Sequence, residues 1–135
     1  MNKLIFVNLP VKDLPRSRTF FEGMGYHFNP QFSIDQGACL VISDTIHAML
    51  LTEPFFQTFT KKQIADAKKS VEVLICLSCE SKAEVDQLVA KAVAGGGSTP
   101  SPVQDHGFMY SHSFEDLDGH VWELMYMDPN APPPN

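Results

Sequence analysis

The chain has 135 residues, 44% apolar and 19% charged, which is enough for one globular domain with a hydrophobic core. Its formal net charge is −6, and its basic residues gather only in two doublets, Lys61–Lys62 and Lys68–Lys69, so we expect no nucleic-acid partner. The N-terminus does not read as a signal peptide, and no apolar run is long enough to span a membrane. The sequence therefore predicts a reduced, cytoplasmic protein that does not bind membranes.

The first predicted element is a strand over residues 4–11, whose side chains alternate between two apolar faces. Asn8 interrupts this pattern as a polar group on an otherwise apolar strand. Asp13 is a suitable N-cap, and we expect a helix to about Glu22 that Gly23 helps to end. Three more strands are predicted over residues 26–32, 38–42 and 46–51.

The next stretch, residues 52–70, breaks the alternation and is predicted to connect two halves of the chain. It begins with three aromatic residues, Phe55, Phe56 and Phe59, and a short helix is predicted over residues 61–69. The aromatic cluster fits either a core plug or the apolar wall of a ligand pocket or dimer contact, and we favour the wall. The connector is too apolar for a free linker, so we expect it to pack near a pocket mouth.

The second half repeats the order of elements in the first half. A strand is predicted over residues 71–79, followed by a helix to Ala94 that begins with the capping box Ser81–Glu84. The glycines at 95–97 end that helix, so they are not a phosphate-binding loop. The remaining predictions are a weak strand at 98–103, a turn at 104–107, a hairpin of residues 108–114 and 120–127, and a loose proline-rich tail at 128–135.

The closing strand carries one carboxylate between two apolar faces. Asp118–Gly119 is a strong hairpin turn, because glycine tolerates positive φ. After the turn, Val121, Glu123, Met125 and Met127 share one strand face. An acid on such a strand costs free energy unless it is paired, bound to metal or directed into a wet cavity. We therefore expect Glu123 to be a buried acid that points into a pocket.

The partner strand of this hairpin extends the same face. Counting back from Glu123 through the turn places Ser111 and Ser113, with Met109, on the pocket side. Tyr110, His112 and Phe114 then face the helix. A one-residue bulge would exchange the two sets, so Tyr110 and His112 remain reserve candidates, although a half-exposed strand position suits His112 better.

The two halves form an internal repeat of a whole β-α-β-β-β unit, residues 4–51 and 71–127. A unit with one helix has an uncovered sheet face, and two such units side by side would leave a cup between their sheets. The fold class is therefore predicted as α+β, with two paired units whose curved mixed sheets form a cup within one domain.

This pattern resembles the vicinal oxygen chelate superfamily, which includes glyoxalase I, bleomycin-resistance proteins, fosfomycin-resistance enzymes and extradiol dioxygenases. The resemblance covers residues 4–127. It rests on Val11-Lys-Asp-Leu14 before an aromatic helix, and on Glu115-Asp-Leu-Asp-Gly-His120 followed by Trp122-Glu-Leu124. Leu117 stands where the family usually has proline. Chains of this size in the family usually dimerise, so the resemblance implies a homodimer.

The resemblance also implies a divalent metal held by inward side chains of the first and last strands of each unit. Glu123 matches the last ligand position, but the other three positions fall at Phe6, near Leu50 and near Leu74. Phenylalanine and leucine do not coordinate cations. We therefore expect no metal cofactor, and we do not expect lactoylglutathione lyase activity.

Two functions remain open. The first is a glyoxalase-like lyase or isomerase in which Glu123 is the base, because burial raises a carboxyl pKa and favours proton abstraction next to a carbonyl. The second is a protein that sequesters a small ligand without catalysis, as bleomycin-resistance proteins do. In either case, the predicted ligand contacts are Phe6, Asn8, Ser111, Ser113 and Met125. Glu123 also fits a structural role, hydrogen-bonded to Asn8 or to serines.

The remaining cysteines and histidines have ordinary structural interpretations. Cys76 and Cys79 lie three apart on a strand, point to opposite faces and have no second pair to complete a zinc site, so we expect small core residues. His47 alternates with Met49, which predicts a core or rim histidine. His27, His106 and His120 are expected at the surface.

Overall fold

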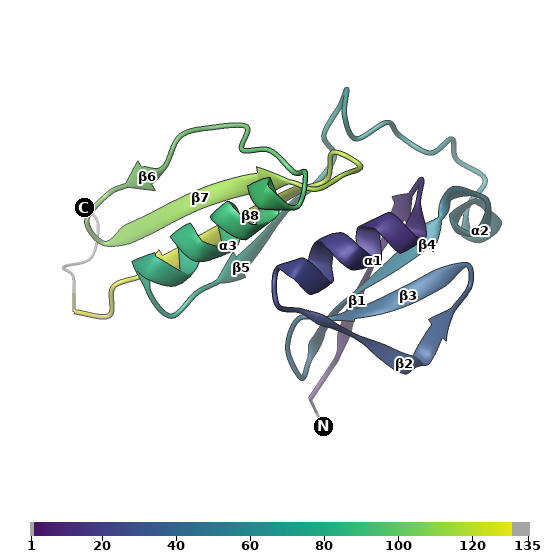
Figure 1. The fold of residues 1–135 in the computed structure, drawn as a ribbon, viewed down its shortest axis with the longest axis horizontal. Helices are drawn as coiled ribbons and strands as arrows, with labels where there is room; N and C mark the ends of the chain where they lie inside the picture. Colours follow the sequence, from purple (N-terminus) through teal and green to yellow (C-terminus); the bar gives the residue numbers. More distant parts are fainter. Residues whose placement is uncertain (1, 131–135) are drawn as a thin grey trace. The chain divides into compact units, whose positions relative to one another are not determined.

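The computed structural model describes residues 2–130 and divides the chain into two compact units, one ending at Asp66 and the other beginning at Ala67. The first unit, purple to blue in Figure 1, contains β1 (Ile5–Val11), α1 (Leu14–Gly23), β2 (His27–Ile34), β3 (Gly37–Val41), β4 (Ile46–Thr52), α2 (Glu53–Phe56) and the 3-10 turn η1 (Gln57–Phe59). The second, green to yellow, contains β5 (Leu74–Ser78), α3 (Lys82–Ala94), β6 (Gln104–Asp105), β7 (Met109–Glu115) and β8 (Val121–Met127).

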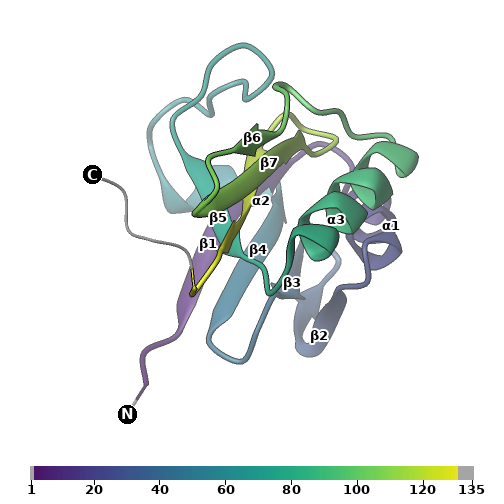
Figure 2. The same ribbon diagram turned by 90° about the vertical axis from the view of Figure 1, so that its left-hand side faces the viewer.

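The two units have the same sheet topology. The strand order is β1-β4-β3-β2 in the first sheet and β5-β8-β7-β6 in the second. Figure 2 shows the first sheet's strands in this order from left to right. In each sheet the first and last strands of the unit pair in parallel, and the other neighbours are antiparallel. The predicted α+β fold with two repeated β-α-β-β-β units of mixed sheet is confirmed.

The core of the first unit lies between α1 and one face of its sheet. Asp13 caps α1 as predicted, since its carboxylate accepts a hydrogen bond from the Arg16 N–H. The buried apolar side chains come from the helix and from alternating strand positions: Leu9, Val11, Leu14, Phe20, Phe21, Phe28, Leu40 and Leu50. The apolar stripe of α1 therefore fixes which sheet face is covered.

The core of the second unit is built in the same way under α3. Ser81 caps the helix as predicted, with its hydroxyl 3.0 Å from the Glu84 N–H. The Glu84 carboxylate accepts from the N–H of Glu80, one residue earlier than a capping box requires. Val85 and Val89 are buried with Phe114, Trp122 and Leu124, and the two aromatic rings stack with centroids 6.2 Å apart.

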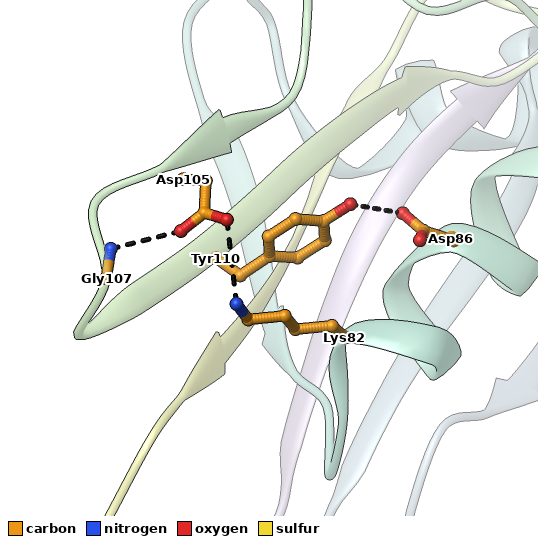
Figure 3. A network of polar contacts seen from close by, with 5 residues as sticks. All are labelled: Lys82, Asp86, Asp105, Gly107 and Tyr110. Carbon is orange, nitrogen blue, oxygen red and sulfur yellow. Dashed lines mark hydrogen bonds and ion pairs between the residues drawn. The ribbon is translucent and has the colours of Figure 1, made fainter. Parts of the chain in front are cut away.

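A surface network ties α3 to β6 and β7 (Figure 3). The Tyr110 hydroxyl donates to the Asp86 carboxylate at 2.6 Å, which raises the pKa of the tyrosine. The Lys82 ammonium lies 3.5 Å from Asp105 and 5.5 Å from the centre of the Tyr110 ring. The Gly107 N–H donates to Asp105 and lowers the pKa of its carboxyl group. Tyr110 thus faces the helix, as predicted from the alternation of β7.

Two predicted elements are wrong. Residues 61–69 form no helix; the helical segment is earlier, at α2 and η1, where Pro54 suits a first turn. The Gln57 side chain then donates to the carbonyls of Thr60 and Lys62, which turns the chain away from a helix. Ile64 is the one large apolar residue in 61–69, so a helix there would have little to bury.

The weak strand predicted over residues 98–103 is also absent. Ser98 alone bridges to Glu115, because Pro100 and Pro102 have no N–H to donate to a ladder. The short strand β6 forms instead at residues predicted to turn. The predicted loose tail falls largely on residues 131–135, outside the described residues. Among the helices of residues 2–130, none has the length and apolarity needed to cross a membrane.

Candidate functional site

The open face of the second sheet, opposite α3, carries a row of polar side chains. Glu123 on β8 is paired with Cys76 on β5 and with Ser113 on β7, so these three side chains lie side by side on one face. In the next row, Met125 is paired with Ser78 and Ser111. The predicted alternation of β7 and β8 is confirmed, and the roles of these residues in ligand binding stay predictions.

Part of this row borders a hollow of about 360 Å³. Glu115, Ser113, Val121 and Glu123 line it from β7 and β8, and Ser101 contributes a hydroxyl 3.3 Å from that of Ser113. The remaining lining comes from the segment before β5, from β5 itself and from one loop residue: Ala67, Lys68, Lys69, Ser70, Val71, Leu74 and Pro100. The hollow therefore joins an acidic strand face to a basic segment within one unit.

Glu123 is half-buried, so the prediction of a fully buried acid at this position is wrong. No donor among residues 2–130 gives a hydrogen bond to its carboxylate. A carboxylate at the wall of a hollow, without a donor from the chain itself, is available to contact a ligand. Glu123 lines this hollow, and its predicted role in a site stays a prediction.

The buried acid of this hairpin is Asp116, which the sequence reasoning missed. It is 7% exposed, and its carboxylate accepts three hydrogen bonds of 3.0 Å, from the N–H groups of Asp118 and His120 and from the indole of Trp122. Burial nonetheless raises the pKa of this carboxyl group. An aspartate at the start of a turn, three residues before a glycine, is the signal that identifies such a group.

Gly119 brings the turn against the basic segment. Its φ is +90°, a conformation that favours glycine. A Cβ at this position would lie 2.8 Å from the backbone nitrogen of Lys68 and 2.9 Å from the carbonyl carbon of Ala67. The close approach of two backbones therefore requires glycine here, and it positions the segment that borders the hollow.

Cys76 is exposed on the open face, so the prediction that it is a core residue is wrong. Burial of part of the side chain, together with the charge of Glu123, raises the pKa of its thiol. Cys79, half-buried, has a pKa raised to about 11, mainly by burial and then by the charge of Glu84. Both thiols are therefore protonated near neutral pH and are weak nucleophiles.

In the first unit, the predicted contacts Phe6 and Asn8 lie on the open face, opposite α1. Phe6 is 43% exposed and stacks on His47 with ring centroids 4.7 Å apart. Asn8 is exposed and pairs with Met49. The Nδ1 atom of His47 is buried without a hydrogen-bond partner among the described residues. His47 is half-buried and stacks on Phe6, which fits the predicted core or rim histidine.

The residues at the family's metal positions do not fit a divalent cation. Phe6 and Leu74 are apolar and partly exposed, and Leu50 is fully buried under α1. Next to Leu50, the residue of β4 that shares the open face with Asn8 is Met49, whose side chain is also apolar. Within residues 2–130, no group of three or more His, Cys, Asp or Glu side chains is arranged to hold a metal ion. Among the residues that line the hollow, Glu123 is accompanied by one other acid, Glu115, and two carboxylates are fewer than the ligands that a bound cation needs.

Comparison with known proteins finds similarity to the family that the motifs resemble. Residues 3–43 match the family model of the bleomycin resistance protein-like N-terminal domain. No curated protein matches the chain. A hypothetical protein of S. aureus is similar in structure, with a TM-score of 0.78, 29% identity, and coverage of 93% of this chain and 95% of that chain.

Two further solved structures have the same fold. A glyoxalase/bleomycin resistance protein/dioxygenase family enzyme of Burkholderia phytofirmans has a TM-score of 0.77 and 15% identity, over 94% of this chain and 100% of that chain. The fosfomycin resistance protein FosX of Listeria monocytogenes has a TM-score of 0.68 and 20% identity, over 96% of each chain. These matches agree with the resemblance seen in the sequence and show that the chain has the fold of the glyoxalase/bleomycin resistance proteins.

Proposed function

We propose that the second unit binds a small organic ligand in its hollow and that the Glu123 carboxylate contacts the reactive part of that ligand. The observation that carries this proposal is a half-buried carboxylate at the wall of the hollow that receives no hydrogen bond from residues 2–130. A folded protein seldom leaves such a group unpaired unless water or a ligand meets it. Ser111, Ser113 and Met125 share its sheet face and are proposed as further ligand contacts.

The chemistry we propose is that of a lyase or isomerase. A carboxylate oxygen of Glu123 removes a proton from a hydroxyl-bearing carbon next to a carbonyl group and returns it to the carbonyl carbon, while the hydroxyl proton moves to the former carbonyl oxygen. The Ser113 hydroxyl, one strand away, donates a hydrogen bond to the carbonyl oxygen as negative charge develops there. This scheme needs no metal ion. Phe6 and Asn8 remain proposed ligand contacts on the open face of the first unit.

The second candidate is sequestration of a ligand without turnover. It is favoured by the match of residues 3–43 to a bleomycin-resistance-like domain, and by the apolar side chains at Phe6 and Leu74. Bleomycin and fosfomycin, after which the similar proteins are named, are the ligands to test first. Tight binding of either compound by EDTA-treated protein, with no chemical change in it, would favour this candidate over the enzyme.

Proton abstraction is tested by hydrogen exchange in D2O. EDTA-treated protein is expected to speed the exchange of carbon-bound protons in at least one of methylglyoxal hemithioacetal, pyruvate and dihydroxyacetone, followed by NMR. Glu123→Gln should lower that rate about 100-fold or more, because an amide is not a base. Glu115→Gln is the matched control: Glu115 also lines the hollow, but it accepts a hydrogen bond from Ser98.

Equal rates in wild type and Glu123→Gln, or no exchange in any of the three compounds, would contradict the enzyme proposal. The hemithioacetal is assayed in parallel with added Ni2+ and Zn2+ for lactoylglutathione lyase activity, which we do not expect. Rapid metal-dependent turnover that Glu123→Gln abolishes would show that a metal site exists despite the apolar residues at the family positions.

We also propose that the chain forms a homodimer, as members of this superfamily of similar size usually do. Exposed apolar residues on the edge strands and just before them are consistent with a partner: Leu4, Ile5, Val71, Val73 and Leu74. Light scattering after size-exclusion chromatography should give a mass of twice the 15.0 kDa chain at micromolar concentration. A single-chain mass over that range would contradict the dimer.

A further inference from the structure

We infer that the first unit has a ligand site of its own, a hollow between α1 and the β2–β3 connection that binds a small zwitterion such as a free amino acid. The hollow has a volume of about 330 Å³. Its walls include side chains of the helix and of the connection: Pro15, Arg18, Thr19, Glu22, Ile34 and Asp35. None of them belongs to the proposed function of the second unit, so the two proposals stand or fall separately.

Three charged side chains of this hollow are available to a ligand. Arg18, Glu22 and Asp35 line it together, yet none of them forms an ion pair or a side-chain hydrogen bond with another group among residues 2–130. Opposite charges that share one hollow without meeting leave room for a molecule that contacts both signs. A zwitterion satisfies them, because its carboxylate pairs with the arginine and its ammonium group pairs with the acids.

The arginine is positioned before a ligand arrives. Arg18 is half-buried, and its guanidinium carbon lies 5.1 Å from the centre of the ring of Phe28, a core residue. This cation–π contact restricts the side chain, so less entropy is lost when it binds an anion. A guanidinium group also presents paired N–H donors that match the two oxygens of a carboxylate. Arg18 is therefore suited to hold the carboxylate of the ligand.

The opposite side of the hollow offers hydrogen-bond acceptors. The Thr19 hydroxyl donates its one hydrogen to the Pro15 carbonyl at 3.1 Å, which leaves its oxygen to accept. The Glu22 and Asp35 carboxylates are acceptors as well. An ammonium group has three N–H donors, one for each of these three groups. Because the acids outnumber the arginine, the hollow disfavours a ligand whose only charge is a carboxylate.

The size and the apolar part of the hollow narrow the ligand further. Its volume is near the lower end of the range for small-molecule sites, about 300–1,000 Å³. Ile34 lines it and is 59% exposed, so an apolar group of the ligand can cover this side chain and gain free energy by removing it from water. A small amino acid with a branched apolar side chain, such as leucine, meets the size, charge and apolar conditions together.

The test compares three probes that differ in charge, each titrated into the full chain and followed by NMR of backbone amides. L-Leucine carries both charges, 4-methylpentanoate lacks the ammonium group and 3-methylbutylamine lacks the carboxylate. Leucine is expected to shift the amide signals of Thr19, Glu22 and Asp35 saturably. The Kd of each singly charged probe should be about tenfold higher or more, since each leaves one side of the hollow unpaired.

Two variants and two matched controls locate the site. Arg18→Gln and Asp35→Asn should each raise the Kd of leucine about fivefold or more. Arg16→Gln and Asp44→Asn make the same charge changes on exposed residues outside the hollow, and each should change it less than about twofold. Asp35 is exposed, so its variant keeps the test decisive where loss of the Phe28 contact destabilises the Arg18 variant.

Three results would overturn the inference. The first is the absence of saturable shifts with leucine up to its solubility limit. The second is a Kd for either singly charged probe equal to that of leucine. The third is an equal response to the hollow variants and their controls, or leucine shifts that lie elsewhere in the chain.

Discussion

Replacing Asp116 with alanine is expected to lower the free energy of unfolding by about 3–5 kcal/mol, because three donors in the β7–β8 turn lose their acceptor. A buried donor left without a partner costs about 1–3 kcal/mol. The loss is smaller than a sum of three such costs, because burying the Asp116 carboxylate is itself unfavourable and raises its pKa. Urea unfolding followed by circular dichroism measures the change.

Asp128→Ala is the matched control for this substitution. The Asp128 carboxylate also accepts a backbone N–H two residues ahead, from Asn130 at 2.9 Å, but this hydrogen bond is exposed to solvent. Its removal should cost less than about 1 kcal/mol, because water replaces the lost acceptor. If the two alanine variants were equally stable, the Asp116 hydrogen bonds would not be the main support of the turn. Asp116→Asn should fall between alanine and wild type, since an amide oxygen still serves the backbone donors.

Gly119→Ala is the second large loss that we expect, about 2–4 kcal/mol of unfolding free energy. Alanine at a φ of +90° is strained by about 1–2 kcal/mol, and its Cβ also meets backbone atoms of Ala67 and Lys68 at 2.8 to 2.9 Å. Backbone atoms cannot move away as the end of a side chain can, so the overlap adds to the strain. Thermal unfolding of the purified variant gives the measurement.

Gly107→Ala separates the two causes. Gly107 has a similar φ of +82°, but a Cβ there would meet nothing within 4 Å. It should therefore show the strain of about 1–2 kcal/mol without the overlap. Equal losses of stability in both variants would show that the close approach of the backbone at 67–68 adds nothing to the strain at Gly119.

The elements that the sequence predicts correctly are those where local chemistry and burial agree. Asp13 and Ser81 cap helices with their own side chains, and the apolar stripes of α1 and α3 face the sheets. The alternation of β7 and β8 could be followed from Glu123 through the turn without a bulge. In these stretches a short window of sequence contains the interactions that decide the structure.

The predictions that fail depend on contacts that a short window does not contain. Glu123 and Asp116 both look like acids within an apolar hairpin, and the indole of Trp122 decides which of them is buried. The spacing of Cys76 and Cys79 argues against a zinc site and predicts core residues, but β5 is an edge strand and leaves the Cys76 side chain exposed. The basic segment became part of the hollow through its contact with Gly119, fifty residues later.

The parallel pairing of β5 with β8 has a consequence for synthesis of the protein on the ribosome. Within the described residues, β5 has β8 as its one hydrogen-bonded neighbour, although the two strands are separated by α3, β6 and β7. Residues 74–78 therefore leave the exit tunnel before residues 121–127 do. Until the later strand emerges, the backbone N–H and C=O groups of the earlier strand have no strand to pair with. During that interval the nascent chain exposes an apolar strand edge that a chaperone is suited to cover.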